Sequence, residues 1–164
     1  MKITKSIAAL LLIIIAATSF VCCDSGYDCS LNNTSYENIG FYTIDDNGKE
    51  QAHTIANPLT VSLMINGTES VMVNNITDAG SVSLPMSYTQ ERDTVIFRYH
   101  DASCDSLFVN HTAHPYYQSM ECGVLMFYKI DGVENTNVWI EDVKIVNKSV
   151  NFEGNENIKI YFYQ

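Results

Sequence analysis

The chain has 164 residues, which is enough for one domain of ordinary size and leaves no room for a second. Hydrophobic residues make up 46% and charged residues 17%, a composition too apolar for a disordered chain and too interrupted for several membrane spans. The 9 basic residues are outnumbered by 19 acidic ones, which argues against nucleic acid as a partner.

Residues 1–22 have the pattern of an export signal. Lys2 and Lys5 form a positive start, and an apolar run from Ile7 to Ala17 follows them. The run is too short to cross a ~30 Å hydrocarbon core as a permanent helix. We therefore expect residues 1–22 to be removed on export.

A cysteine pair, Cys22 and Cys23, ends this segment and resembles the lipobox of bacterial lipoproteins, in which the cysteine after the cut carries lipid. Cleavage before Cys23 places the small Cys22 ahead of the cut, whereas cleavage before Cys22 would place the branched Val21 there. We predict lipid on Cys23, with Cys22 as the alternative. A plain secreted protein is the competing interpretation.

Residues 23–35 then form the lipidated cysteine and a polar tether. Without Lys2 and Lys5, seven basic residues face the same 19 acidic ones, which gives a net charge of −12. Anionic headgroups repel such a surface, so the lipid must supply the anchoring. At ~3.5 Å per residue the tether reaches up to about 40 Å from the membrane.

Three cysteines remain for disulfide chemistry: Cys29, Cys104 and Cys122. An exported chain meets a compartment that permits disulfides, so we expect one bridge and one free thiol. A Cys29–Cys122 bridge would close a long loop, worth roughly 4–5 kcal/mol in the chain-entropy view. A Cys104–Cys122 bridge would join neighbouring strands instead. The spacing supports no zinc site.

Short strands separated by polar turns follow over residues 36–164. Turn signals recur at Asp46-Asn47-Gly48, Asn66-Gly67, Ala79-Gly80, Asp131-Gly132 and Gly154-Asn155. Asn-Gly and Asp-Gly tolerate the positive φ that two-residue hairpin turns require. Between the turns, apolar residues recur at every second position, which is typical of half-buried strands. These residues are Val61, Leu63, Ile65, Val95, Phe97, Tyr99, Leu107, Val109, Ile158, Ile160 and Phe162.

Two further segments predict strands of other kinds. The segment from Cys122 to Ile130 is apolar on both faces, which predicts a central strand covered on each side. The segment from Thr136 to Val146 predicts a long strand with Trp139, Val143 and Ile145 on one face. No helical period is sustained. Seven to nine antiparallel strands predict an all-β, immunoglobulin-like β-sandwich, with a closed barrel as the alternative.

A series of short motifs runs through the chain: the lipobox cysteine, a second cysteine six residues on, Phe41-Tyr42, Ser83-Leu84-Pro85, Asp93-Thr94-Val95, Glu121-Cys122-Gly123, Trp139-Ile140-Glu141-Asp142-Val143 and Asn157-Ile158-Lys159-Ile160-Tyr161-Phe162. In these motifs the chain resembles a family of small Bacteroidetes lipoproteins of unknown function. The resemblance implies a cell-envelope lipoprotein with an all-β domain. We expect its lipid to anchor it in the outer membrane, on either the periplasmic or the surface face. The resemblance also implies that Cys29 pairs with Cys122, and it implies no activity.

Bacteria that carry similar proteins add O-glycans at Asp-Ser or Asp-Thr followed by an apolar residue. Two triplets have this form, Asp93-Thr94-Val95 and Asp105-Ser106-Leu107. The resemblance therefore implies Thr94 and Ser106 as candidate O-glycosylation sites. Asp and Ser also serve as plain turn residues at strand starts, which is the alternative.

Five side chains with metal-binding or nucleophilic chemistry lie close together in the sequence: His100, Asp101, Cys104, His111 and His114. Side chains at i and i+3 of a strand point to opposite faces, so His111 and His114 share one ion only if the strand breaks between them. His111 lies on the same face as Leu107 and Val109, which favours a hydrogen-bonded, half-buried imidazole. We predict no metal and no cofactor.

No catalytic motif stands out in the remaining sequence. There is no Gly-x-Ser-x-Gly, glycine-rich phosphate loop or HExxH. The segment from Asp45 to Gly48 indicates a turn, and the neighbours Glu141 and Asp142 face opposite sides of a strand. The favoured hypothesis is a noncatalytic, lipid-anchored envelope module that binds an unknown envelope protein or fills a structural role.

Glycan binding is the alternative hypothesis. Aromatic faces stack on sugar rings, and Tyr116 and Tyr117 are the candidate contacts, with Tyr88 and Trp139 as further aromatic candidates. Packing in the core or at strand edges is the favoured explanation of such residues, because single aromatic residues at strand positions are ordinary. A metal- or thiol-dependent enzyme at the histidine cluster is the least favoured hypothesis.

Overall fold

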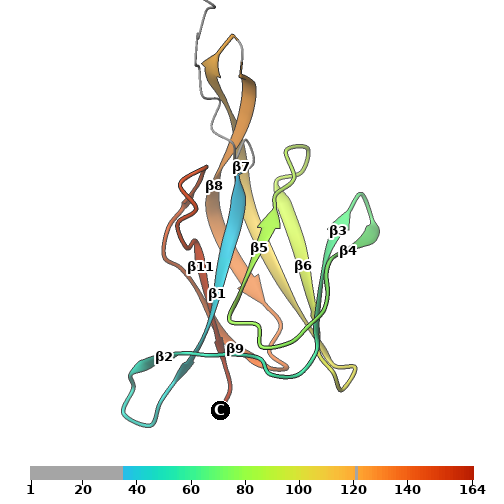
Figure 1. The fold of residues 1–164 in the computed structure, drawn as a ribbon, viewed down its shortest axis with the longest axis vertical. Coiled ribbons are helices and arrows are strands. Elements are labelled where there is room, and N and C mark those ends of the chain that lie inside the picture. The colour runs from blue at the N-terminus through green and yellow to red at the C-terminus, as the bar shows by residue number, and fades with distance from the viewer. Residues whose placement is uncertain (1–34, 121) are drawn as a thin grey trace, which may run out of the picture.

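The computed structural model describes residues 35–120 and 122–164, which form strands and no helix (Figure 1). No helix that could cross a membrane occurs in these two ranges. The strands are β1 (Tyr36–Ile44), β2 (Glu50–Ala52), β3 (Leu59–Ile65), β4 (Thr68–Ile76), β5 (Ser81–Pro85), β6 (Arg92–Arg98), β7 (Cys104–Ser119), β8 (Gly123–Asn135), β9 (Ile140–Ile145), β10 (Ser149–Val150) and β11 (Ile158–Phe162).

The strands form two sheets packed face to face, so the predicted β-sandwich is confirmed. One sheet has the order β2-β1-β11-β9, with β5 also paired to β1, and the other has the order β10-β8-β7-β6-β3-β4. The described chain holds eleven strands rather than seven to nine. The strands beyond the predicted number are very short, because β2 has three residues and β10 has two.

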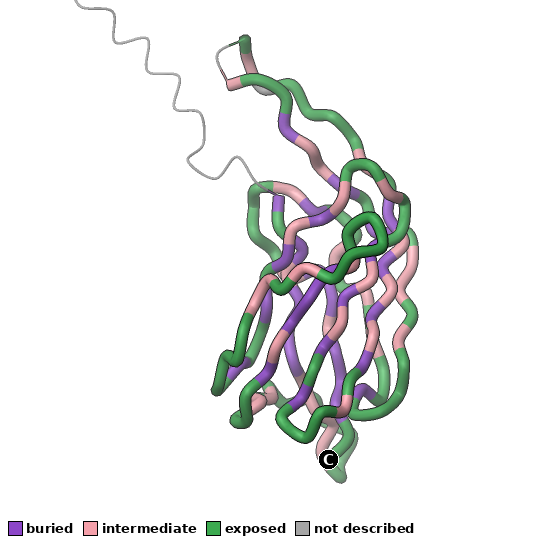
Figure 2. Tube along the Cα trace, turned by 90° about the vertical axis from the view of Figure 1, so that its right-hand side faces the viewer, coloured by how far each residue is buried: buried purple, intermediate pink, exposed green. Residues whose placement is uncertain are grey.

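The core lies between the sheets and follows the predicted alternation closely (Figure 2). The ring of Phe41 on β1 contacts Phe97 of the opposite sheet and Phe162 of its own, at centroid distances of 6.2 and 5.4 Å. Burying one such side chain contributes roughly 1.5–3 kcal/mol. The exception is Ile65, which is exposed because it lies next to the turn that ends β3.

The predicted turns are confirmed at two places. Asn66 and Gly67 both have positive φ, 50° and 77°, and join β3 directly to β4. In the β1–β2 turn, the carboxylate of Asp45 accepts the backbone N–H groups of Asn47 and Lys49. The predicted turn at Asp131-Gly132 is wrong, because both residues lie inside β8. Asp131 is the extra residue of a bulge opposite β7.

Strand β8 is not the buried central strand that its composition predicted. Its outer neighbour, β10, pairs with it over two residues only, at Tyr128 and Lys129. The outer halves of β7 and β8 pair with each other as a hairpin that projects beyond the sandwich (Figure 1). Apolar residues in this part are therefore exposed, among them Val124.

Strand β9 is also shorter than predicted, running over Ile140–Ile145 instead of residues 136–146. Trp139 lies before the strand and is half exposed, whereas its neighbour Ile140 is fully buried. The backbone from Val138 to Ile140 bends because its N–H groups bind a buried carboxylate of β7. That contact builds the pocket described below.

The two ends of the sandwich differ. Strand β1 begins at the end from which the β7–β8 hairpin projects, and it runs to the opposite end, where the C-terminus lies (Figure 1). Its parallel partner β11 runs the same way, with Ile39 opposite Ile158. We call these the hairpin end and the C-terminal end.

Candidate functional site

The cluster of five chemistry-bearing residues is dispersed in the structure. His100 and Asp101 lie in the exposed turn between β6 and β7, and Cys104 begins β7. His111 is buried in the middle of β7, while His114 is exposed on its outer half. Among residues 35–120 and 122–164, no group of three or more His, Cys, Asp or Glu side chains could hold a metal ion.

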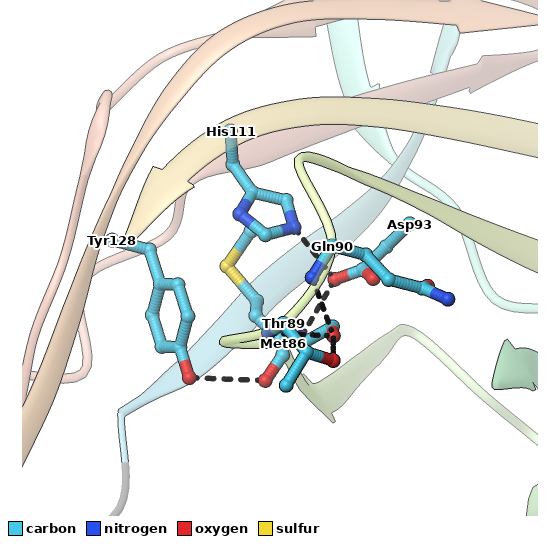
Figure 3. Close-up of polar contacts among 7 residues, drawn as sticks. Met86, Thr89, Gln90, Asp93, His111 and Tyr128 are labelled. Carbon is cyan, nitrogen blue, oxygen red and sulfur yellow. Dashed lines mark hydrogen bonds and ion pairs between the residues drawn. The ribbon is translucent and has the colours of Figure 1, made fainter. Parts of the chain in front are cut away.

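His111 instead forms a buried pair with Asp93 (Figure 3). Its Nε2 lies 2.9 Å from Asp93 Oδ2, and the same oxygen accepts the Ser87 N–H at 2.9 Å. The imidazole packs edge-on against the ring of Tyr128 at 5.6 Å. The expected hydrogen-bonded imidazole is thus confirmed, although it is buried and not half buried.

Glu37 on β1 adds a second buried acid on the opposite sheet. Burial and the nearby negative charge of Asp93 raise the pKa of Glu37 to about 8. Its Oε1 has no hydrogen-bond partner among the described residues. At pH 7 the side chain is mostly neutral, because an uncharged carboxyl loses less hydration on burial than a carboxylate.

A pocket lined by aromatic residues lies at the C-terminal end. It has a volume of about 290 Å³, and its ring-bearing wall residues are His53, Tyr99, His100, Trp139, Phe162 and Tyr163. The ring of Phe162 lies 5.4 Å from that of His53, and the ring of Tyr99 lies 5.8 Å from that of Trp139. Partial burial lowers the pKa of His53, which favours the neutral form of its imidazole.

A buried carboxylate on β7 positions two of these rings. Asp105 accepts the hydroxyl of Tyr99 at 3.1 Å and the backbone N–H of Trp139 at 2.8 Å. It also accepts the Thr136 hydroxyl and the backbone N–H groups of Val138 and Ile140. The indole Nε1–H of Trp139 donates to the Ser103 hydroxyl at 2.8 Å.

This arrangement is suited to binding. Hydrogen bonds to a charged, buried acceptor hold the rings before any ligand arrives, which lowers the ordering entropy that binding must overcome. Aromatic walls favour a flat or apolar group, and the neutral form of His53 offers one donor and one acceptor.

The predicted ligand tyrosines lie at the other end. Tyr116 and Tyr117 are on the projecting part of β7, and 39% and 59% of their surfaces are exposed. The face of Tyr116 is covered by Phe127, whose ring stacks on it at 4.6 Å. Tyr88 is exposed in the loop between β5 and β6. The structure does not bring Tyr88 or the tyrosine pair together with Trp139.

Both candidate glycosylation residues lie within strands. Thr94 on β6 pairs with Phe108, and Ser106 on β7 pairs with Ile96. Both are partly exposed. The acids that precede them are buried, and each is engaged by hydrogen bonds: Asp93 with His111 and Asp105 with the Trp139 segment. Modification of Thr94 and Ser106 remains a prediction.

The cysteines divide between the two ends. Cys104 is a free, exposed thiol at the start of β7, and Cys122 follows the other end of this 16-residue strand. At ~3.3 Å per residue the two are separated by roughly 50 Å, so the alternative Cys104–Cys122 bridge is wrong. Cys122 is disulfide-bonded, but Cys29 lies outside the described residues, as do Cys22 and Cys23. The Cys29–Cys122 pairing therefore remains a prediction.

The sequence did not lead us to predict that Asp105 and Glu37 are buried acids in the interior of the sandwich. Asp105 stood out only as part of a glycosylation triplet. The available signal was its position two residues before Leu107 on the same face of an alternating strand, where a buried residue is expected. Glu37 has the same relation to Ile39 and Phe41 on β1.

A comparison with protein families matches residues 58–162 to a family of unknown function (DUF6452). The match begins after β1 and β2, although β1 is paired on both sides within its sheet. Searches of curated proteins and of solved structures found no match. The match covers more than half of the chain.

Proposed function

Since the chain belongs to this family of unknown function, we propose its role from its own residues. We propose a lipoprotein of a bacterial cell envelope, anchored in the outer membrane by lipid on Cys23, whose β-sandwich binds a partner and carries out no catalysis. The observation that carries the proposal is the cysteine pair that directly follows the apolar run of residues 7–17.

The position of β1 supports this proposal. Twelve residues separate Cys23 from Tyr36, where β1 begins at the hairpin end. A tether from Cys23 would therefore join the sandwich at the hairpin end, opposite the aromatic pocket. Attachment at that end leaves the pocket accessible to a partner.

The burial and hydrogen bonding of the acidic and histidine side chains support a binding role over a catalytic one. His111, Asp93 and Asp105 carry the chemistry of a general base, yet each is buried and engaged in hydrogen bonds that hold the fold together. A catalytic base needs to reach a substrate proton. The aromatic pocket, by contrast, is open to a ligand.

The test is fatty-acid labelling of the wild type, Cys22→Ala and Cys23→Ala in a host that processes lipoproteins, combined with protease treatment of intact cells. We expect label in the wild type and Cys22→Ala and none in Cys23→Ala. Label that survives the loss of Cys23 moves the lipid to Cys22. Absence of label in every form rejects the lipoprotein. Removal of the domain by protease would place it on the cell surface, and protection would place it in the periplasm.

Glycan binding is a second candidate, favoured by the half-exposed indole of Trp139 in the aromatic pocket. Aromatic faces stack on sugar rings. Screening the chain on a glycan panel, with Trp139→Ala beside Tyr116→Ala and Tyr117→Ala, separates the two possible sites. Loss only in Trp139→Ala assigns binding to the pocket, and loss only in the tyrosine variants assigns it to the hairpin. A panel without any binding rejects this candidate.

A further inference from the structure

The projecting part of the β7–β8 hairpin exposes apolar side chains, and we call its residues 116–120 and 122–125 the hairpin tip. Tyr117, Met120 and Val124 are exposed over 59%, 89% and 61% of their surfaces. Scattered exposed apolar residues are common, but a group on one projecting element marks an interaction surface.

Charge also sets the hairpin tip apart from the rest of the molecule. Glu121 is the single charged residue between Pro115 and Tyr128, in a chain with 19 acidic and 9 basic residues. The rest of the acidic surface is repelled by anionic headgroups, whereas the hairpin tip carries little charge to oppose contact with a membrane. Its tyrosines have the apolar body and polar hydroxyl that favour the membrane–water interface.

The hairpin tip also lies where a lipid anchor would bring it close to the bilayer. It projects from the end of the sandwich at which β1 begins (Figures 1 and 2). From the buried His111 to the end of β7 at Ser119 the strand advances roughly 25 Å at ~3.3 Å per residue. The segment between Cys23 and Tyr36 spans at most about 40 Å. The lipid on Cys23 and the hairpin tip can therefore reach the same bilayer at the same time.

We propose that the hairpin tip is a second membrane contact, which places Tyr117, Met120 and Val124 at the boundary between headgroups and acyl chains. This inference rests on the proposed lipid anchor. A few apolar side chains bind a bilayer weakly by themselves, but the anchor makes their binding intramolecular and raises their effective concentration at the surface. The predicted Cys29–Cys122 bridge would strengthen this effect by holding the hairpin tip six residues from the lipidated cysteine.

Two contacts would also orient the domain. A single flexible tether lets the sandwich rotate, whereas contact by the hairpin tip directs the aromatic pocket away from the bilayer. The hairpin tip thus contacts the lipid surface itself, and the C-terminal end remains accessible to the partner.

The test uses the lipidated full chain bound to vesicles of phosphatidylethanolamine with a minor fraction of phosphatidylglycerol. Trp139 is the single tryptophan of the chain and lies at the C-terminal end, so the wild type reports on the end that faces away from the bilayer. In Met120→Trp we expect a second, blue-shifted emission that lipids brominated near the headgroup quench at least two-fold. Wild-type emission should stay unquenched.

Val71→Trp is the matched control, because Val71 is an exposed apolar residue on β4, outside the hairpin tip. It should resemble the wild type, and Val124→Asp in the Met120→Trp chain should abolish the quenching. Equal quenching at positions 71 and 120, or none at position 120, overturns the proposal. A hairpin tip that binds a protein would also stay unquenched in these protein-free vesicles.

Flotation of the same samples with the vesicles separates the two proposals. A chain that floats while Trp at position 120 stays unquenched retains the lipid anchor and rejects contact by the hairpin tip. A chain that carries no lipid on Cys23 rejects the proposed function itself, as the fatty-acid labelling would show independently.

Discussion

The two ends of the sandwich use aromatic residues in opposite ways. At the C-terminal end, Tyr99 and Trp139 are held by hydrogen bonds to Asp105 and Ser103, so their rings form the wall of a pocket. At the hairpin end, Tyr117 projects from a two-stranded ribbon and is largely exposed. The fold therefore fixes the aromatic rings at the C-terminal end by hydrogen bonds, whereas it leaves Tyr117 at the hairpin end exposed to meet a surface.

The buried acids show the same contrast. Asp105 accepts five donors and ties β7 to the Thr136–Ile140 segment. Glu37 lies near the start of β1, and one of its oxygens has no partner among the described residues. Asp105 thus fixes the segment that it binds, whereas burial of Glu37 is tolerated because its side chain is mostly neutral at pH 7.

The largest effect is expected from Asp105→Ala. The substitution leaves several buried N–H and O–H donors without an acceptor, and each unsatisfied group costs about 1–3 kcal/mol. We expect a loss of roughly 3–5 kcal/mol in the free energy of unfolding, measured by urea denaturation followed through Trp139 fluorescence.

Asp101→Ala is the control for that experiment, because Asp101 accepts the Ser103 N–H and hydroxyl in an exposed turn. It should cost less than about 1 kcal/mol. A similar loss in both variants would contradict the role assigned to Asp105 at the C-terminal end.

A smaller effect is expected at Glu37 and depends on pH. The folded-state pKa of about 8 lies above the ordinary value of 4.5, so between these values the folded chain binds more protons than the unfolded chain. Stability therefore falls as pH rises through this window. From pH 6 to pH 9 we expect Glu37 to account for a loss of ~1–3 kcal/mol, measured by urea unfolding at each pH.

Glu37→Gln removes the titration and should flatten this part of the pH profile. Glu134→Gln is the control, since Glu134 is an exposed acid paired with Arg92 on the sheet surface. A profile in Glu37→Gln as steep as that of the wild type would refute the neutral state of the buried acid.

The smallest effect is expected at the hairpin tip. Tyr117→Ser and Met120→Ser remove exposed side chains, so the free energy of unfolding should change by no more than about 0.5 kcal/mol. Tyr128→Phe, which removes a buried hydroxyl bound to the Met86 carbonyl, should cost more, about 1 kcal/mol. If Tyr117→Ser were the more damaging change, the hairpin tip would be part of the folded core.

Much of the fold followed from alternation alone. Strands β3, β6, β7 and β11 bury the residues that a period of two selects, because each has one face on the core. The same reasoning failed for β8, since an apolar composition on both faces does not distinguish a central strand from a projecting hairpin. That distinction depends on the length of the neighbouring strand β10, which local sequence does not determine.

The site was less predictable, because it forms from segments far apart in the chain. The pocket joins residues 53–58 and 99–100 to Trp139, Phe162 and Tyr163. Asp105 can be buried in a strand of alternating apolar residues only because hydrogen-bond donors some 30 residues later in the chain lie next to its carboxylate. A polar residue in such a strand is equally typical of a turn until its partners are known.

The pairing of β1 with β11 has a consequence for the order of folding. The first sheet joins residue 39 to residue 158, and β11 lies between β1 and β9. The sheet therefore cannot be completed until the last strand has left the ribosome, and such long-range pairing is intrinsically slow. Until then β1 lacks its parallel partner. A chain that postpones its assembly in this way is well suited to crossing a membrane unfolded, as export of the proposed lipoprotein requires.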